Sequence, residues 1–213
     1  MRSLSLVLPI LLAATPIAAE PVSFSGWTEQ RFSLFQKVDY GFSSSRLSVS
    51  SDDAASMTYR RLPAGSWGAT SASWSWAVSQ SVPATDLTRK GGDDRNLSLY
   101  FVFLPEAEAR RIGEGGSIRN LLNNDQARVL VYVWGGVHGR GDVLSSPYLG
   151  ARGKTIVRRP SGTGSFRETV DLAGDYTRAF GGAAGALVGL AVSADSDDTN
   201  STIRGEISGL SIN

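Results

Sequence analysis

The 213-residue sequence has no cysteine and a single histidine. The first absence excludes disulfide bonds and a lipid-modified cysteine, so stability has to come from packing, with or without a bound metal. The second leaves His138 as the one side chain that could act as the base of a serine nucleophile, and no serine lies in a Gly-x-Ser-x-Gly motif. His138, in a glycine-rich stretch, is therefore interpreted as a loop residue of a polar site.

An excess of charge of one sign is also absent, because 21 Lys and Arg stand against 20 Asp and Glu. Residues 1–19 contain Arg2 and no acidic residue, so residues 20–213 carry 20 basic and 20 acidic side chains. The basic side chains are scattered along the chain. A surface that binds polyanions needs a net basic face, and nucleic acid is not an expected partner.

Long hydrophobic runs are lacking as well. Residues 1–19 hold Arg2, a short apolar stretch interrupted by Pro9, and small residues before Glu20. This pattern predicts a secretory signal peptide cut after Ala19, because the apolar stretch is too short to span a membrane. We expect residues 20–213 to form a single periplasmic or secreted domain without a membrane span.

Short apolar runs separated by Gly, Ser and Thr predict an all-β fold, a two-layer antiparallel β-sandwich of jelly-roll-like form. Trp74, Trp76 and Val78 alternate with small residues and are expected on one strand face, in the core. Two short helices are expected, at residues 105–113 and at 175–180, the second capped by Asp175. Strands are expected at residues 47–49, 57–62, 73–78, 97–103, 129–134, 155–158, 187–193 and 203–212.

Other aromatic residues stand beside turns and are predicted to be exposed: Trp67, Trp134, Tyr148 and Tyr176. Aromatic rings offer a flat apolar surface, with a polar atom at one edge in Trp and Tyr. Exposed rings on a secreted β-sandwich indicate a surface that contacts the apolar faces of sugars.

Polar clusters follow or precede several strands. Asp93, Asp94 and Arg95 come after two glycines; they either bind a ligand such as sugar hydroxyls or a metal, or form an Asp–Arg pair that holds a hairpin. Asp175 is either a helix cap or a ligand-binding residue. Because strand ends meet at the edges of a sandwich, we expect these clusters to share one rim.

The segment after the apolar run 187–193 concentrates carboxylates. Asp195, Asp197 and Thr199 alternate, which places three oxygen ligands on one side of an extended turn and suits calcium. The alternative is that these side chains bond to the local backbone of a turn. A helix-loop-helix calcium site is excluded, because its sixth position is Asn200 instead of glycine and the following residues predict a strand.

The order of these clusters along the chain resembles the exported bacterial family called domain of unknown function 3047. The resemblance covers residues 45–213, and it implies a periplasmic or secreted β-sandwich with no established activity, catalytic residue or ligand. The sequence departs from the family pattern in two places: Asp-Ser-Asp-Asp-Thr at 195–199 stands where Asp-Thr-Asp-Asn-Thr is expected, and residues 105–124 form a longer connection. The matching clusters are Trp74-Ser75-Trp76, residues 91–95 with 99–103, residues 132–135, residues 174–181 and residues 195–199.

The main functional hypothesis is an exported, non-enzymatic domain that binds carbohydrate or an envelope glycan. One alternative is a polysaccharide hydrolase or lyase, which needs two carboxylates roughly 5 to 9.5 Å apart across a cleft. Another is a structural partner of an envelope protein, marked by an exposed apolar patch without a pocket. Calcium is the candidate cofactor, with Asp195, Asp197 and Thr199 as ligands. The predicted ligand-binding residues are Asp93, Asp94, Arg95, Trp134, His138, Asp175 and Tyr176.

Overall fold

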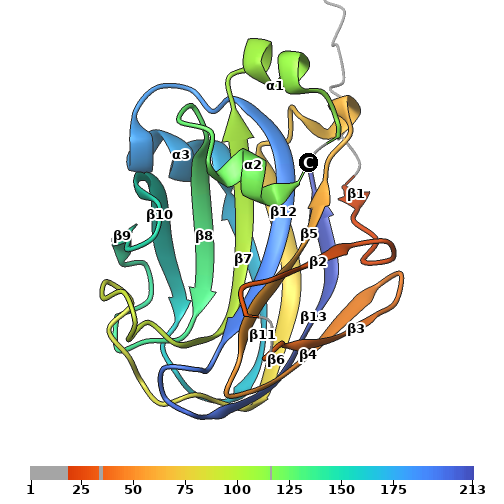
Figure 1. Ribbon diagram of the computed structural model, residues 1–213. Coiled ribbons are helices and arrows are strands. Elements are labelled where there is room, and N and C mark those ends of the chain that lie inside the picture. The colour runs from red at the N-terminus through yellow and green to blue at the C-terminus, as the bar shows by residue number, and fades with distance from the viewer. Residues whose placement is uncertain (1–18, 34–35, 116) are drawn as a thin grey trace, which may run out of the picture.

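Two β-sheets lie face to face in the computed structural model (Figure 1), which describes residues 19–33, 36–115 and 117–213. The predicted all-β, two-layer sandwich is confirmed. The predicted signal peptide lies outside the described residues, apart from Ala19 at its end. Within those residues, no helix has the length and apolar character needed to cross a bilayer.

The first sheet has six strands, and every pair in it is antiparallel. Its order is β11-β6-β13-β4-β3, with β1 paired to β13, so that β11 is an edge strand. The bounds are β1 (Glu20–Pro21), β3 (Asp39–Phe42), β4 (Arg46–Asp52), β6 (Ser71–Gln80), β11 (Gly164–Asp171) and β13 (Thr202–Ile212).

The second sheet has seven strands in the order β2-β5-β12-β7-β8-β10-β9. Its pairs are antiparallel except for β8 and β10, which run parallel and correct the prediction of purely antiparallel pairing. The short strand β9 folds back along the free side of β10. The bounds are β2 (Thr28–Arg31), β5 (Ala55–Arg61), β7 (Arg95–Leu104), β8 (Arg128–Trp134), β9 (Val143–Ser146), β10 (Gly150–Arg159) and β12 (Ala186–Asp195).

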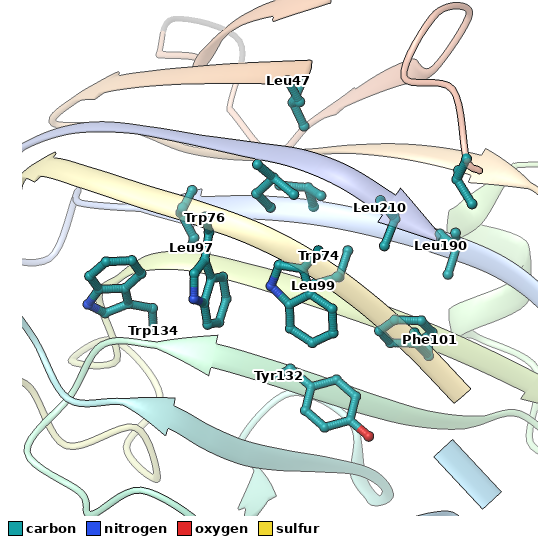
Figure 2. Packing of buried hydrophobic residues seen from close by; sticks show 14 of the residues in the cluster. Leu47, Trp74, Trp76, Leu97, Leu99, Phe101, Tyr132, Trp134, Leu190 and Leu210 are labelled. Atoms are coloured by element: carbon teal, nitrogen blue, oxygen red, sulfur yellow. The ribbon is translucent and has the colours of Figure 1, made fainter. Parts of the chain in front are cut away.

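The core between the sheets contains a row of aromatic rings (Figure 2). The predicted core residues Trp74 and Trp76 lie there, with ring centroids 5.4 Å apart. Trp134 joins them, 5.5 Å from Trp76, and is 1% exposed, so its predicted exposure is wrong. It alternates in phase with Leu130 and Tyr132, which also face inward. Full burial of one large apolar side chain contributes roughly 1.5–3 kcal/mol.

The outer face of the seven-stranded sheet carries a second apolar cluster, beneath α1 (Glu106–Ile112), α2 (Ile118–Leu122) and the 3₁₀ turn η1 (Ala64–Ser66). The helix predicted at 105–113 is confirmed as α1, whereas α2 was not predicted. Ser117 caps α2, because its side chain accepts a hydrogen bond from the Asn120 amide. Trp67 belongs to this cluster and is buried, so its predicted exposure is also wrong.

A third helix, α3 (Leu172–Phe180), covers one end of the space between the sheets (Figure 1). Its N-cap is Asp171, whose side chain accepts a hydrogen bond from the Gly174 amide. The helix therefore starts one turn before the predicted cap, and Asp175 lies inside it. Tyr176 faces inward and packs on Phe103 with ring centroids 5.2 Å apart.

Candidate functional site

A pocket of about 490 Å³ lies on the outer face of the seven-stranded sheet. Four strands of this sheet, β5, β7, β8 and β10, supply its floor through Met57, Tyr100, Val131 and Thr155. Tyr100 points outward because its neighbours Leu99 and Phe101 occupy the inner face. The helix α2, the turn between β9 and β10, and the end of β2 surround this floor.

One part of the pocket is apolar and aromatic. Ile118 and Leu122 reach it from α2, which belongs to the long connection at residues 105–124. Phe32 and Tyr148 line the pocket while remaining 59% and 53% exposed. The predicted exposure of Tyr148 is confirmed. Two large rings are thus open to solvent beside a floor that offers further apolar surface.

The other part of the pocket is organised by Arg95, at the start of β7. Its Nη1 lies 2.7 Å from Asp93 Oδ2 and 3.0 Å from Asp195 Oδ2. Its Nε donates to Ser98 Oγ at 2.8 Å, and its Nη2 donates to Tyr100 Oη at 3.2 Å. The Asp–Arg pair considered from the sequence is therefore present, and the guanidinium also holds a carboxyl group from the end of β12.

The charge balance around Arg95 changes the ionisation of Asp195. Burial lowers the pKa of Arg95, but Tyr100, Asp195 and Asp93 outweigh it, so the net pKa is raised and the side chain stays charged. Burial raises the pKa of Asp195 to about 8; Arg95 opposes this, and a hydrogen bond with Asp197 adds to it. Two carboxyl groups share one guanidinium, and the neutral form of Asp195 avoids an excess negative charge.

Asp94 joins the two loops at this end of the sheet. It is fully buried and accepts hydrogen bonds from the amides of Asp198 and Thr199, at 3.2 and 2.8 Å. The Thr199 hydroxyl also donates to Asp94, at 2.5 Å. Asp94 therefore fixes the turn after β12 and does not line the pocket.

The structure does not bring the three predicted calcium ligands, Asp195, Asp197 and Thr199, together as one set, because two of them have other partners. Asp195 is held by Arg95, and Thr199 is bonded to Asp94. Within the described residues, the one group of three carboxylates whose oxygens all lie within 4.8 Å of one another belongs to Asp94, Asp197 and Asp198. Burial, with Asp94 and Asp197 next, raises the pKa of Asp198. Calcium binding itself stays a prediction.

Tyr148 links the aromatic and polar parts of the pocket. Its hydroxyl donates to Asp93 Oδ1 at 2.9 Å, and the ammonium group of Lys90 lies 5.4 Å from its ring centroid. Burial, followed by the nearby Asp93 carboxylate, raises the pKa of Tyr148. The phenol is consequently neutral at physiological pH, and its ring is held in place at the edge of the pocket.

The structure brings Asp93, Arg95, Asp195 and Asp197 together at the pocket, but it does not form the single rim predicted from the sequence. Trp134 ends β8 near this site, yet its ring lies in the core. His138 does not line the pocket; it is 18% exposed, with Nε2 3.5 Å from Asp86 Oδ1.

Asp175 and Tyr176 lie on α3, at the end of the sandwich opposite the start of β7 (Figure 1). Asp175 accepts a hydrogen bond from Tyr132 Oη at 2.6 Å and forms an ion pair with Arg178. Placing these two residues with the other clusters was therefore wrong, because the clusters occupy two ends of the strands.

Sequence reasoning missed several residues of the pocket. Tyr100 had a usable signal, because a tyrosine out of phase with Leu97, Leu99 and Phe101 must face the other side of its strand. Phe32 and Arg119 had no such signal, since they belong to short segments without a regular pattern. The remaining lining residues missed are Gln30, Ala55, Met57, Leu87, Ile118, Leu122, Asn123, Val131, Ser146, Pro147, Leu149, Thr155 and Asp198.

Comparison with known families gives a match over nearly the whole chain. Residues 24–210 match the family described as protein of unknown function (DUF3047). The chain belongs to the DUF3047 family. This confirms the resemblance found in the sequence and brings no activity with it. A search of curated protein sequences gives no match.

Solved structures to which the chain is distantly similar include a xyloglucanase domain, an adhesin domain and a xylanase. The xyloglucanase domain of NopAA from Sinorhizobium fredii, in complex with cellobiose, has a TM-score of 0.47 at 10% identity, over 94% of this chain and 99% of that one. The K3 adhesin domain of Lys-gingipain from Porphyromonas gingivalis has a TM-score of 0.37 at 13% identity, over 92% and 99%. An endo-1,4-β-xylanase of Trichoderma reesei has a TM-score of 0.37 at 11% identity, over 92% and 98%. These similarities assign neither activity nor ligand to the DUF3047 chain.

Proposed function

We propose that this protein is exported, as residues 1–19 predict, and binds a saccharide in the pocket on the outer face of the seven-stranded sheet. One observation carries the proposal: exposed aromatic rings and a fixed set of hydrogen-bonding groups line the same pocket. Phe32 and Tyr148 supply the rings, and Asp93, Arg95 and Asp195 supply the polar groups.

The chemistry of a sugar ring matches this combination. Its C–H faces are apolar and pack on aromatic rings, while its hydroxyl groups at the ring edge need donors and acceptors. The pocket provides carboxyl oxygens of Asp93 and Asp195 for those hydroxyls, and Tyr148 stands between the two kinds of surface. Its volume of about 490 Å³ falls within the usual range of small-molecule sites.

Binding is supported better than hydrolysis by the arrangement of the carboxyl groups. Glycoside hydrolysis needs two carboxyl groups on opposite sides of the bond to be cleaved. Asp93 and Asp195 both contact the same nitrogen of Arg95, so they lie on one side. Among the described residues, α2 and β2 contribute Arg119, Asn123 and Gln30 as polar lining, with no carboxylate.

The alternative of a purely structural partner also receives less support. It predicts an exposed apolar patch without a pocket, whereas the exposed rings here border a pocket with an organised polar part. The concave shape and the fixed hydrogen-bonding groups favour a ligand of small cross-section, such as a few sugar units.

The test is a glycan array probed with the folded protein, followed by calorimetric titration of the strongest neutral oligosaccharide. Tyr148→Ala and Phe32→Ala should each weaken binding about tenfold, because each removes a ring contact of about 1.4 kcal/mol. Phe42→Ala is the matched control, since Phe42 is an exposed aromatic residue on β3 and lies outside the pocket.

Two results would refute the proposal. One is the absence of binding to every neutral oligosaccharide on the array. The other is an equal loss of affinity in the Phe42 control and the two pocket variants, because that pattern would show that the pocket is not where the saccharide binds.

A further inference from the structure

A second polar cluster lies at the open edge of the sandwich, around Glu168 of β11. Glu168 lies on the same face of β11 as Phe166 and Val170, which face the core, so its side chain points between the two sheets. Its side chain is fully buried. A buried carboxylate requires compensation by charge or hydrogen bonds.

Three arginines supply that compensation. Arg158 of β10 donates from Nε and Nη2 to Glu168 Oε2, at 3.0 and 2.7 Å. Arg159 donates from Nε to Glu168 Oε1 at 2.9 Å. Arg140, from the loop between β8 and β9, lies further away, with Nη2 3.5 Å from Oε2. In the described part of the chain, Glu168 is the sole carboxylate paired with any of these arginines.

The cluster therefore carries more positive than negative charge. Two guanidinium groups are enough to satisfy the carboxylate of Glu168 at normal hydrogen-bond distances. Arg140 adds a third charge at a longer distance, and its side chain is 55% exposed. The neighbouring Asp175 does not restore the balance, because it forms its own ion pair with Arg178.

The arginines also keep donors for an additional partner. Within the described residues, the side chain of Arg159 donates from Nε to Glu168 and stacks with its Cζ 3.9 Å from the Phe166 ring centroid, which leaves both Nη groups without a hydrogen bond. Stacking holds the guanidinium plane in place, and this geometry suits bidentate recognition of an oxyanion. Arg140 provides further N–H donors from the solvent side.

We propose that Arg140 and Arg159, supported by Arg158, bind an anionic substituent of an acidic polysaccharide, such as a carboxylate or a sulfate ester. Recognition of the anion follows from this cluster, whereas the choice of a polysaccharide as its carrier rests on the proposed function. The site is separate from the pocket, because Arg158 faces the inside of the sandwich and the pocket lies on the outer face of the same sheet.

The experiment measures binding of dextran sulfate and of polygalacturonate to the folded protein, with uncharged dextran as the reference polymer. The two acidic polymers distinguish a sulfate ester from a carboxylate. Arg140→Gln and Arg159→Gln should each weaken binding of the preferred polymer about tenfold. Raising the salt from about 0.05 to 0.5 M should also weaken binding of that polymer to the wild-type protein. Arg167→Gln is the matched control: it removes the same charge from the residue beside Glu168, on the opposite face of β11. The control should stay within twofold of wild type.

Inorganic sulfate tests recognition of the anion alone. Titration with sulfate should shift the Nε–H NMR signal of Arg159 in the wild-type protein. Titration with uncharged dextran should leave that signal unchanged. An equal loss in Arg140→Gln and Arg167→Gln would overturn the site, because binding would then follow total charge. Binding of sulfate without binding of either acidic polymer would overturn the polysaccharide assignment. Neither result depends on Tyr148 or Phe32, so failure of the saccharide pocket is recognised separately.

Discussion

Asp195→Asn should remove most of the dependence of stability on pH between pH 5 and 8. In the folded protein, burial raises the pKa of Asp195 from 3.8 to about 8. Between these two values the folded chain keeps a proton that the unfolded chain releases. The free energy of unfolding therefore falls as pH rises, and the stabilisation is complete below pH 3.8 and lost above pH 8.

The magnitude follows from one proton. A difference of one bound proton changes the free energy of unfolding by about 1.4 kcal/mol per pH unit, or about 2.7 kcal/mol between pH 5 and 7. For a chain of this length, that lowers Tm by about 5–10 °C. Asparagine resembles the neutral carboxyl group, and its amide oxygen can still accept a hydrogen bond from Arg95. Arg95 also retains its ion pair with Asp93, at 2.7 Å. The pKa of Asp198 is raised too, so the free energy of unfolding of Asp195→Asn should still fall with pH, but with a shallower slope than in the wild type.

The assay is urea unfolding at pH 5, 6, 7 and 8, followed by tryptophan fluorescence. Asp125→Asn, at an exposed carboxylate outside the pocket, is the control and should keep the wild-type slope. The carboxylates with lowered pKa values, Asp86 and Glu108, lose their stabilising effect in more acidic solution than this window. Wild-type stability that is constant or rises with pH, or a wild-type slope in Asp195→Asn, would refute the reasoning.

Three further variants test the packing and the loops. Trp134→Ala should lower the free energy of unfolding by about 3–5 kcal/mol in urea titrations, because it empties part of the aromatic core; a change below 1 kcal/mol would show that the ring is not buried. Glu168→Gln should cost about 3 kcal/mol in the same titrations, since it leaves half-buried arginines without their carboxylate; unchanged stability at low salt would contradict this. Asp94→Ala should accelerate hydrogen exchange of the Thr199 amide roughly tenfold or more, because the amide loses its acceptor; exchange at the wild-type rate would show that Asp94 does not fix the turn.

Local sequence patterns predicted strands well where large apolar side chains lie on one face and small residues on the other. The alternation of Trp74 and Trp76 with small residues identified both a strand and its buried face. Trp134 failed because residues 129–134 are apolar on both faces: Leu130, Tyr132 and Trp134 face the sandwich core, while the residues between them face the cluster below α1 and α2. Periodicity assigns residues to the two faces of such a strand, but it does not tell whether a residue at the end of the strand is buried or exposed.

Composition and alternation by themselves determined that this chain forms a two-layer β-sandwich, whereas the Asp93–Arg95 pair was one of two alternatives that the sequence left open. Only the tertiary structure decided the site. Pairing of β12 with β7 places Asp195 opposite Arg95, about a hundred positions away in sequence, and α2 adds Ile118 and Leu122 to the lining of the pocket. The same strand order places Asp175 and Tyr176, on α3, at the end of the sandwich opposite Arg95. Periodicity is a property of neighbouring residues, whereas the end of a strand at which a cluster lies depends on strand order and direction, which are set by packing of the whole chain.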